Sequence, residues 1–324
     1  MGDSPQAPDP ARRRLVRRRR RLARRRGQQR LAGGIAALLA ACAAAVALAL
    51  SGGGNDEAAR PAELVSGAAP TALELSREQA EQHAEAVDEV LAYTPYLRAG
   101  TESAPEVAIT FDDGPSIYTD DILRVLRRFD APATFFVLGE MVEARPQLVR
   151  RALAQGHAIG SHSLDHPQFG QLAPEAQEAE LESVDSIMRA QGLAAPRLFR
   201  PPYGSFDLET LSLLDQRAEL MVLWSVDTGD YENPGWQVIA DRALAEARPG
   251  SVILLHDGGG DRAQTLVALP LILKGLERAG LRPVTVPQLL ADNPPPRDQS
   301  LEQAAGIPQP GENLPDGPET PPSG

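Results

Sequence analysis

Two adjacent carboxylates, Asp112 and Asp113, follow the apolar run Val107–Phe111 in the sequence VAITFDDGP. The run is rich in β-branched residues and predicts a strand, so both carboxylates should lie at a strand's end. Carboxylates this close repel each other unless a cation or an arginine compensates their charge. One of them can then bind a metal ion while the other acts as general base for a water molecule, as metal-assisted hydrolysis requires. Because DDGP is also favourable turn chemistry, a turn without a catalytic role is the alternative.

A pair of histidines, His162 and His166, follows about 50 residues later in the sequence HSLDH. On a helical turn, side chains four residues apart share one side, so both imidazoles can reach one divalent ion. Zn²⁺ binds histidine nitrogen at ~2.0–2.1 Å, and its catalytic sites use three protein ligands with one open position. With Asp113 as the third ligand, the set becomes His-His-Asp. A histidine pair on a loop can also be merely solvated or hydrogen-bonded.

Two further polar segments have residue types that suit the same reaction. In RPPYG the prolines stiffen the backbone, so that Arg200 can orient a carboxylate and the Tyr203 N–H can face a developing oxyanion. His256 follows the apolar run SVILL and suits a general acid, with Asp230 holding its ring and favouring the protonated form. The alternatives are a simple turn for RPPYG and a buried core histidine for His256.

Strand and helix patterns alternate regularly between residues 105 and 290. The predicted strands are Val107–Phe111, Thr134–Leu138, Ala158–Ser161, Leu198–Arg200, Leu220–Val226, Val252–Leu255 and Pro283–Val286. The predicted helices are Ile117–Phe129, Pro146–Gln155, Pro174–Gln191, Leu208–Asp215, Trp236–Ala247 and Thr265–Ala279. This alternation predicts an α/β fold with a parallel sheet, closed or nearly closed into a barrel. The carboxyl ends of its strands would bring the polar residues to one face.

The segments TFDDGP, HSLDH, RPPYG, VDTGDY and LLHD, in this order, resemble the five motifs of the polysaccharide deacetylases, carbohydrate esterase family 4. The resemblance covers roughly residues 105–290. It implies a distorted (β/α)₇ barrel that binds Zn²⁺, or a similar divalent ion such as Co²⁺ or Ni²⁺. It also implies an enzyme that removes acetyl groups from N-acetylated sugar polymers.

The resemblance assigns a role to each matching position of this chain. Asp112 would be the base, with Arg200 as its tether, and the metal ligands would be Asp113, His162 and His166. Asp230 would tune His256 as general acid. Tyr203 would supply an oxyanion N–H, and Leu254 would form a wall of the pocket for the acetyl methyl group. There is one departure from the family's pattern. Tyr231 stands where the family commonly has tryptophan. Since tyrosine still offers a flat face to a sugar ring, we expect a changed substrate groove with catalysis retained.

The first 30 residues contain 12 arginines, although the whole chain has a formal net charge of −12. Residues 31–50 carry no charge, and at ~1.5 Å per residue a helix of that length spans a bilayer's hydrocarbon core. Arginine excess marks the cytoplasmic side. The pattern predicts a cytoplasmic segment (1–30), a single-pass membrane anchor (31–50) and an extracellular catalytic domain. A run of arginines abutting an apolar segment is better explained by topology than by nucleic-acid binding.

Two other modes of export fit the same segment. One is a cleaved secretory signal, which alanine-rich sequences suit. The other is lipidation at Cys42, within the sequence LAAC. Under all three interpretations the catalytic part leaves the cell. Because Cys42 is the sole cysteine, the exported part has no disulfide.

The remaining segments flank the catalytic domain. Residues 51–70 are rich in Gly, Ala and Pro and predict a flexible linker, and residues 71–104 predict a helical spacer. Residues 291–324 predict a disordered tail, because nine prolines fall between residues 292 and 324 without apolar periodicity. The sequence gives no indication of an oligomeric state.

The substrate is inferred from the predicted location outside the cell. An exported, membrane-tethered deacetylase first meets the cell's own wall, which favours peptidoglycan N-acetylglucosamine. The alternatives are N-acetylmuramic acid, an exopolysaccharide, chitin oligomers and the O-acetyl esters of xylan. A non-catalytic glycan-binding module is a hypothesis of another class, and it predicts glycan binding without acetate release.

Overall fold

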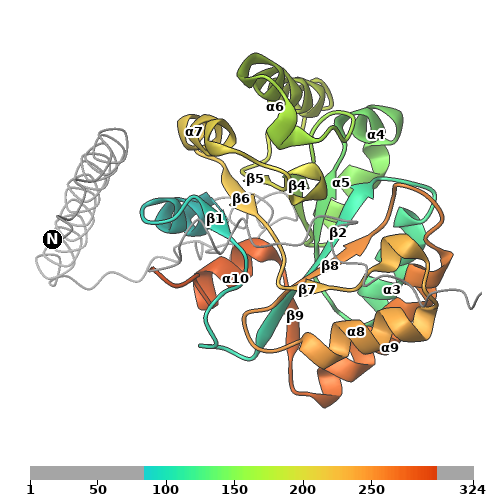
Figure 1. Ribbon diagram of the computed structural model, residues 1–324. Coiled ribbons are helices and arrows are strands. Elements are labelled where there is room, and N and C mark those ends of the chain that lie inside the picture. Colours follow the sequence, from blue (N-terminus) through green and yellow to red (C-terminus); the bar gives the residue numbers. More distant parts are fainter. Residues whose placement is uncertain (1–83, 298–324) are drawn as a thin grey trace, which may run out of the picture. The chain divides into compact units, whose positions relative to one another are not determined.

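Residues 84–297 are described by the computed structural model, in which strands and helices alternate along the chain (Figure 1). The strands are β1 Tyr96–Leu97, β2 Glu106–Gly114, β3 Thr134–Val137, β4 Ala158–Ser161, β5 Leu198–Phe199, β6 Leu220–Val222, β7 Val226–Asp227, β8 Val252–His256 and β9 Arg282–Val284. The helices are residues 84–91, α3 Thr119–Arg128, α4 Gly139–Ala144, α5 Pro146–Ala154, α6 Pro174–Ala190, α7 Leu208–Arg217, α8 Trp236–Glu246, α9 Ala263–Arg278 and α10 Val286–Asp292. Short 3₁₀ turns are Phe169–Gln171, Pro202–Gly204 and Asp230–Glu232.

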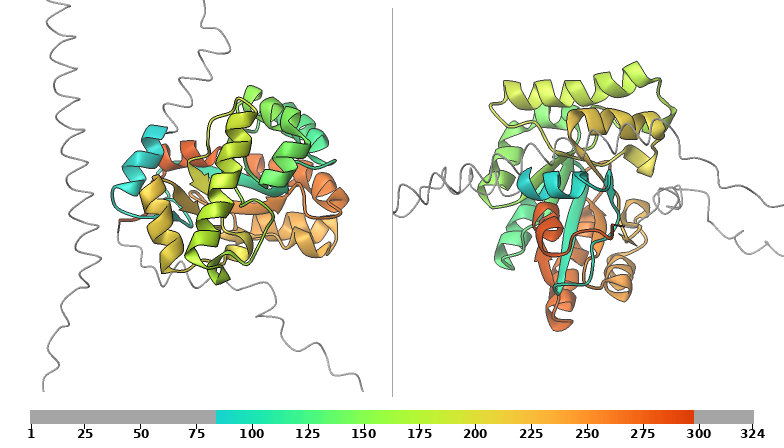
Figure 2. Two further views of the ribbon diagram at one scale, coloured as in Figure 1. Left: turned by 90° about the horizontal axis from the view of Figure 1, so that it is seen from above. Right: turned by 90° about the vertical axis from the view of Figure 1, so that its left-hand side faces the viewer.

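The strands form one parallel sheet in the order β1-β6-β5-β4-β3-β2-β8-β7, and β9 pairs with the first residues of β2. Every strand pair is parallel, as the strand–helix alternation predicts. The sheet curves, and the helices lie around its outside (Figures 1 and 2). This parallel half-barrel is consistent with the expected distorted (β/α)₇ barrel. Within residues 84–297 no pairing joins the two end strands β1 and β7, so the sheet stays open.

The segment that the sequence presents as one strand, Leu220–Val226, is divided in the structure. Its first part, β6, pairs with β5 and β1, whereas its second part, β7, pairs with β8. The connecting residues cross between the two edges of the sheet, since the Leu223 N–H bonds to Leu97 O and the Ser225 N–H to Val252 O. One apolar run therefore supplies strands to two separate parts of the sheet. The strands that pair with its two halves, β1 and β8, are distant from it in sequence.

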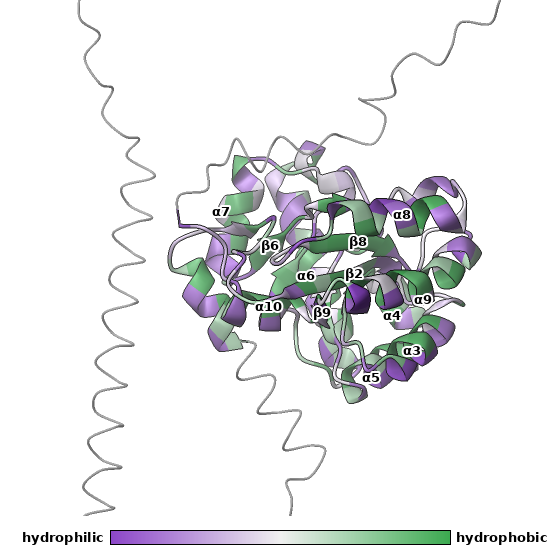
Figure 3. Cartoon of the chain, turned by 90° about the horizontal axis from the view of Figure 1, so that it is seen from below, coloured by the Kyte–Doolittle hydropathy of each residue, from purple (hydrophilic) through white to green (hydrophobic). Residues whose placement is uncertain are grey.

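Alternation along β2 separates the core into two layers. Val107, Ile109 and Phe111 belong to the cluster that packs the sheet against the outer helices. Ala108 belongs to the cluster inside the curve of the sheet, where Thr110 and Asp112 point by the same two-residue period. Figure 3 shows the apolar character of β2, β6 and β8. All nine residues of β2 are buried, so its charged end is enclosed by protein.

The described fold extends beyond the predicted domain of residues 105–290 at both ends. The helix over residues 84–91 and β1 contribute to the inner cluster, within the predicted spacer 71–104. At the other end, α10 replaces the end of the strand predicted at Pro283–Val286. Asn293 is fully buried and accepts a hydrogen bond from the Ala104 N–H. Residues 291–297 thus belong to the fold, and the predicted disordered tail begins too early.

Among residues 84–297, no helix combines the length and apolar character needed to cross a membrane. The predicted cytoplasmic segment 1–30, anchor 31–50 and linker 51–70 lie outside the described residues, together with most of the tail. Their boundaries remain predictions.

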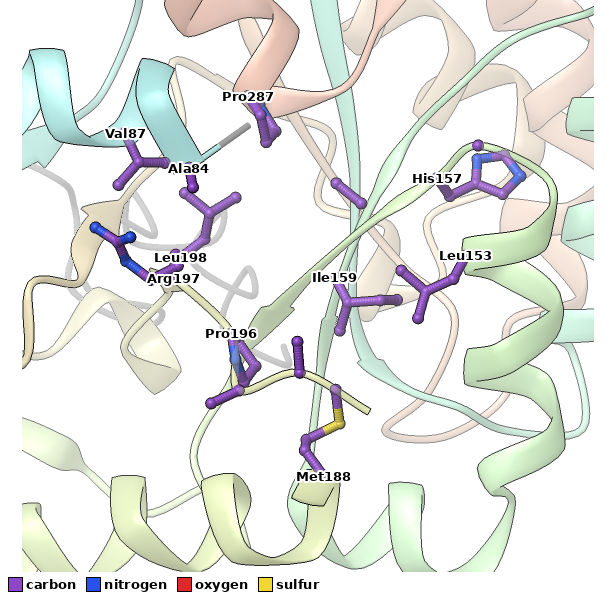
Figure 4. Close-up of a pocket in the computed structure, with 14 residues that line it drawn as sticks. Ala84, Val87, Leu153, His157, Ile159, Met188, Pro196, Arg197, Leu198 and Pro287 are labelled. Atoms are coloured by element: carbon purple, nitrogen blue, oxygen red, sulfur yellow. The ribbon is translucent and has the colours of Figure 1, made fainter. Parts of the chain in front are cut away.

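A pocket of about 310 Å³ lies at the start of β4 and β5, at the opposite end of the strands from the polar residues (Figure 4). It is lined mostly by apolar side chains, among them Val87, Ile159, Met188 and Leu198. His157 lies at its edge, and burial lowers the pKa of this imidazole to about 4. The pocket offers no cluster of groups suited to catalysis.

The close packing around Gly160 in β4 can be tested by substitution. A Cβ at this position would lie 2.5 Å from the Phe136 ring, and that ring lies 4.1 Å from the Arg200 guanidinium carbon. Substituting Gly160→Ala should lower the free energy of unfolding by about 1–3 kcal/mol, because a packed core has no room for the methyl group. Urea denaturation measures this, and adding Phe136→Leu should restore part of the loss. An unchanged stability in G160A would contradict the packing described.

Candidate active site

The polar residues predicted from the sequence converge on one pocket of about 400 Å³ at the carboxyl ends of the strands. The pocket is lined by Asp112, Asp113, Leu138, His162, His166, Pro201, Tyr203, Trp224, Asp227, Tyr231, Leu254, His256, Gly259 and Arg262. Of the ten predicted site residues, eight line the pocket. The other two, Arg200 and Asp230, are buried directly behind it and contact Asp112 and His256.

Asp113, His162 and His166 form a cluster whose potential ligand atoms all lie within 4.8 Å of one another. Asp113 Oδ1 is 3.4 Å from His162 Nε2 and 3.3 Å from His166 Nε2. Within residues 84–297, no other group of three His, Cys, Asp or Glu side chains comes close enough together to hold one metal ion. The predicted His-His-Asp set is therefore assembled in space.

The chemistry of this cluster fits a divalent cation. Asp113 Oδ1 is buried without any hydrogen-bond partner, which is costly for a carboxylate oxygen unless a cation compensates it. The Nδ1 atom of His162 lies 2.7 Å from Arg200 O, and since a carbonyl can only accept, Nδ1 carries the proton. Nε2 then presents its lone pair to the cluster. Burial lowers the pKa of His162 to about 3, which keeps the ring neutral, as a ligand must be.

Backbone irregularities, and no helical turn, bring these ligands together. Residues 162–166 form a loop after β4, in which Ser163 and His166 have positive φ angles of 72° and 71°. The expected helical spacing of the two imidazoles is therefore wrong, although their ring centroids lie 5.0 Å apart. On β2 the register shifts between Asp112 and Gly114, and Asp113 has a φ of 71°. Because consecutive strand residues normally face opposite sides, this bulge is what lets both carboxylates reach the pocket.

Asp112 is paired with a fully buried arginine. Arg200 Nη1 donates to Asp112 Oδ1 at 2.7 Å and to Thr110 Oγ1 at 2.8 Å. The same guanidinium donates to the carbonyl oxygens of Val222, at the end of β6, and of Leu223, in the segment that crosses to β7. Burial raises the pKa of Asp112, and the charge of Arg200 opposes that rise. Asp112 is thus held rigidly as a carboxylate whose proton affinity exceeds that of an exposed aspartate.

His256 forms a second charged pair, with Asp230. Its Nδ1 lies 2.7 Å from Asp230 Oδ1, and its backbone N–H donates to Asp230 Oδ2 at 2.9 Å. Thr265 Oγ1 also donates to Asp230 Oδ2. Burial lowers the pKa of His256, but the charge and hydrogen bond of Asp230 outweigh it and raise the pKa to about 9. The imidazolium is therefore the stable form at neutral pH, and its Nε2–H is available as a proton donor.

Two tyrosines and a leucine complete the predicted set. The Tyr203 ring packs edge-on against the His166 ring, with the ring centroids 4.5 Å apart. The backbone of Tyr203 has a positive φ of 59°. The Tyr231 ring packs edge-on against His256 at 5.4 Å. Leu254 is nearly fully buried in β8 and lines the pocket, as expected of an apolar wall.

Other residues that line the pocket were not assigned a role from the sequence. Trp224 lies in the crossing segment between β6 and β7, which the sequence presents as an uninterrupted strand. Asp227, within the sequence VDTGDY, accepts from the Gly229 N–H and from the Tyr231 hydroxyl. Arg262 donates to the carbonyl oxygens of Gly258 and Gly259, which border Asp113. The sequence does carry one signal for Asp227, since it directly follows the apolar run Leu220–Val226, as the other polar site residues follow theirs.

Comparisons with known proteins point to one family. The family model described as polysaccharide deacetylase matches residues 99–218. A peptidoglycan-N-acetylglucosamine deacetylase of Bacillus cereus is 39% identical over 187 residues, which are 57% of this chain and 87% of that protein. A chitooligosaccharide deacetylase of Sinorhizobium fredii is 39% identical over 203 residues, or 59% of this chain and 94% of that protein. The crystal structure of a peptidoglycan N-acetylglucosamine deacetylase in complex with 4-naphthalen-1-yl-N-oxidanyl-benzamide is similar, with a TM-score of 0.59, 33% identity, and coverage of 62% of this chain and 95% of that one.

The buried pair of Arg200 and Asp112 predicts a specific pattern of stabilities. Arg200→Met should destabilise the fold by about 3–5 kcal/mol, because Asp112 is left as an uncompensated buried charge. In the double variant with Asp112→Asn that charge is absent, so the loss should be clearly smaller than the sum of the two single losses. Urea denaturation of the four proteins measures the coupling. Additive losses would show that the two side chains do not depend on each other.

Proposed function

This chain belongs to the polysaccharide deacetylases of carbohydrate esterase family 4, and we propose that it removes acetyl groups from the N-acetylglucosamine of peptidoglycan. The proposal rests mainly on the shared pocket, which is lined by the Asp113, His162 and His166 cluster, by Asp112 and by the imidazolium of His256. The choice of peptidoglycan is supported by the names of the similar Bacillus cereus protein and of the similar solved structure. The chitooligosaccharide deacetylases among the similar proteins make chitin oligomers the nearest alternative.

Asp113, His162 and His166 would hold a divalent cation, and we propose Zn²⁺, since two imidazoles and one carboxylate are a common catalytic zinc set. Co²⁺ and Ni²⁺ suit the same ligands. When bound, such an ion supplies a Lewis acid that polarises a carbonyl oxygen and lowers the pKa of a water molecule.

Asp112 is the general base of the proposed reaction. It lies beside the cluster, with Oδ2 3.8 Å from His162 Nε2, while Arg200 holds its other oxygen. Its raised pKa makes it a better acceptor for a proton of the attacking water than an exposed aspartate would be. Because Arg200 fixes the orientation of Asp112, little reorganisation is needed at the moment of proton transfer.

His256 is the general acid, and it donates its Nε2 proton to the departing amine. Asp230 keeps that proton in place before the reaction and stabilises the correct tautomer. The backbone N–H of Tyr203 would donate to the developing oxyanion, and Leu254 would contact the acetyl methyl group. Acetate and a free amino sugar are the products.

We also propose that the catalytic domain acts outside the cell, anchored through residues 31–50. The arginine-rich segment before this apolar stretch supports that orientation. A secreted or lipid-anchored form would meet the same substrate.

Acetate release by the full chain tests the proposed function and the assignment of the base together. The chain should release acetate from peptidoglycan faster than from chitin oligomers or acetylxylan, and a chelator should abolish the release. Asp112→Asn should lower kcat by at least about 10²-fold, because general base catalysis is lost, while one metal ion per chain remains bound. Asp165→Asn, at an exposed position of the His162–His166 loop, is the matched control and should retain wild-type activity. Near-normal turnover in D112N would show that another group is the base.

The pKa of His256 predicts the alkaline side of the pH–rate profile. A general acid acts only while protonated, so kcat/KM should hold below pH 9 and fall as pH rises through about 9. Asp230→Asn removes the charge that raises this pKa, and the alkaline limb should therefore move to lower pH. A profile recorded for both proteins decides the matter. If the alkaline limb stays in place in D230N, that limb does not report the His256–Asp230 pair.

A further inference from the structure

Asp257 is a fully buried carboxylate next to the active site that the proposed reaction does not use. Its Oδ2 accepts a hydrogen bond from the buried hydroxyl of Thr119, whereas its Oδ1 is buried without a partner. Burial raises the pKa of Asp257 to about 7. A carboxylate in such surroundings disfavours folding, which suggests a task other than stability.

The backbone around Asp257 is bonded to both sides of the metal ligand Asp113. On the preceding side, the N–H groups of Asp257 and Gly258 both donate to Asp112 O, at 3.0 and 3.2 Å. On the following side, Ser116 Oγ donates to Asp257 O. The Asp257 carboxylate also packs so closely on Gly114 that a Cβ there would collide with both of its oxygens.

Thr119 joins this set of contacts to helix α3. Its hydroxyl accepts from the Ser116 N–H at 2.7 Å and donates to the Asp257 carboxylate. Thr119 is the first residue of α3, and it is buried. One hydroxyl therefore connects the start of the helix, the loop after Asp113 and the loop after His256.

Asp113 needs such support because its backbone is in an unfavourable conformation. Its φ of 71° lies in the left-handed region, where a non-glycine residue persists only when its surroundings enforce it. Relaxation to a negative φ would turn the side chain away from His162 and His166, since the bulge at Asp113 is what directs it there. The backbone N–H groups of Asp257 and Gly258 bond to the peptide before Asp113, and the Asp257 carboxylate packs on Gly114 directly after it. These are the two places where this rotation would begin.

We propose that Asp257 and Thr119 are positioning residues that hold Asp113 in the conformation required to bind a divalent cation. The inference rests on the metal site of the proposed function. Asp257, which directly follows the general acid His256, would then affect metal affinity and take no part in proton transfer. Neither side chain lines the pocket, so both would act through Asp113.

Metal affinity of the folded full chain tests the proposal, with zinc titrated against a chromophoric chelator. Thr119→Val deletes both hydrogen bonds of the hydroxyl at constant shape, and it should weaken zinc binding about 10–100-fold, as loss of a supporting partner typically does. Thr119→Ser keeps the hydroxyl and should bind zinc within about twofold of wild type. Asp257→Ala should weaken binding at least as much as T119V. Asp257→Asn keeps an acceptor for the Thr119 hydroxyl, so its zinc affinity should fall less than that of D257A.

Thr210→Val provides the matched control. Thr210 is a buried threonine whose hydroxyl also bonds to an aspartate, Asp207, at the start of α7. T210V should lower Tm as T119V does but leave zinc affinity unchanged. The alkaline limb of the pH–rate profile should stay in place in T119V, since His256 is not altered.

The outcomes separate this inference from the proposed function. Wild-type protein that binds no zinc would refute the metal site itself. Wild-type protein that binds zinc, together with folded T119V of unchanged zinc affinity, would overturn only the positioning role. If D257A does not fold, T119V, judged folded by circular dichroism, decides the question.

Discussion

Two neighbouring carboxylates at the end of a buried strand impose the constraint on which this structure depends. Asp112 and Asp113 are both largely excluded from water, and each needs a positive partner. Asp112 has the guanidinium of Arg200 at 2.7 Å. Asp113 has the imidazoles of His162 and His166 around an unpartnered oxygen, which is the arrangement of a site completed by a cation. The two carboxylates therefore differ in function because their partners differ, although they are adjacent in sequence.

The fold supplies those partners from separate strands. β2 carries the two aspartates, the loops after β4 and β5 carry the histidine pair and Arg200, and β8 ends at His256. Because all these strands are parallel, their carboxyl ends open on the same pocket. The end of β6 and the residue after it add the carbonyl groups that hold Arg200, so the point where the predicted strand divides also serves the site. The loop after β8 encloses Asp113 from the other side, where Arg262 fixes its carbonyl groups.

Much of this arrangement was predictable from the sequence, since apolar runs ending in polar residues mark strands of a parallel sheet. The strand Ala158–Ser161 and the convergence of Asp113, His162 and His166 were predicted on this basis and are present. The bulge at Asp113 and the loop geometry of His166 could not be predicted, because a positive φ in a non-glycine residue arises from tertiary contacts. The division of Leu220–Val226 likewise depends on β1 and β8, which are remote in sequence. α10 did have a local signal, since Thr285 accepts from the Gln288 N–H as a helix cap and Pro287 stands in the first turn.

Folding gathers Asp113, His162 and His166 so closely that we infer one cation bound among them. Anomalous diffraction at the zinc absorption edge, from crystals of the zinc-loaded protein, tests it most directly. We expect one anomalous peak in the pocket, at about 2.0–2.2 Å from an oxygen of Asp113 and from Nε2 of each histidine. Zinc bound by other residues, with no density among these three, would contradict it.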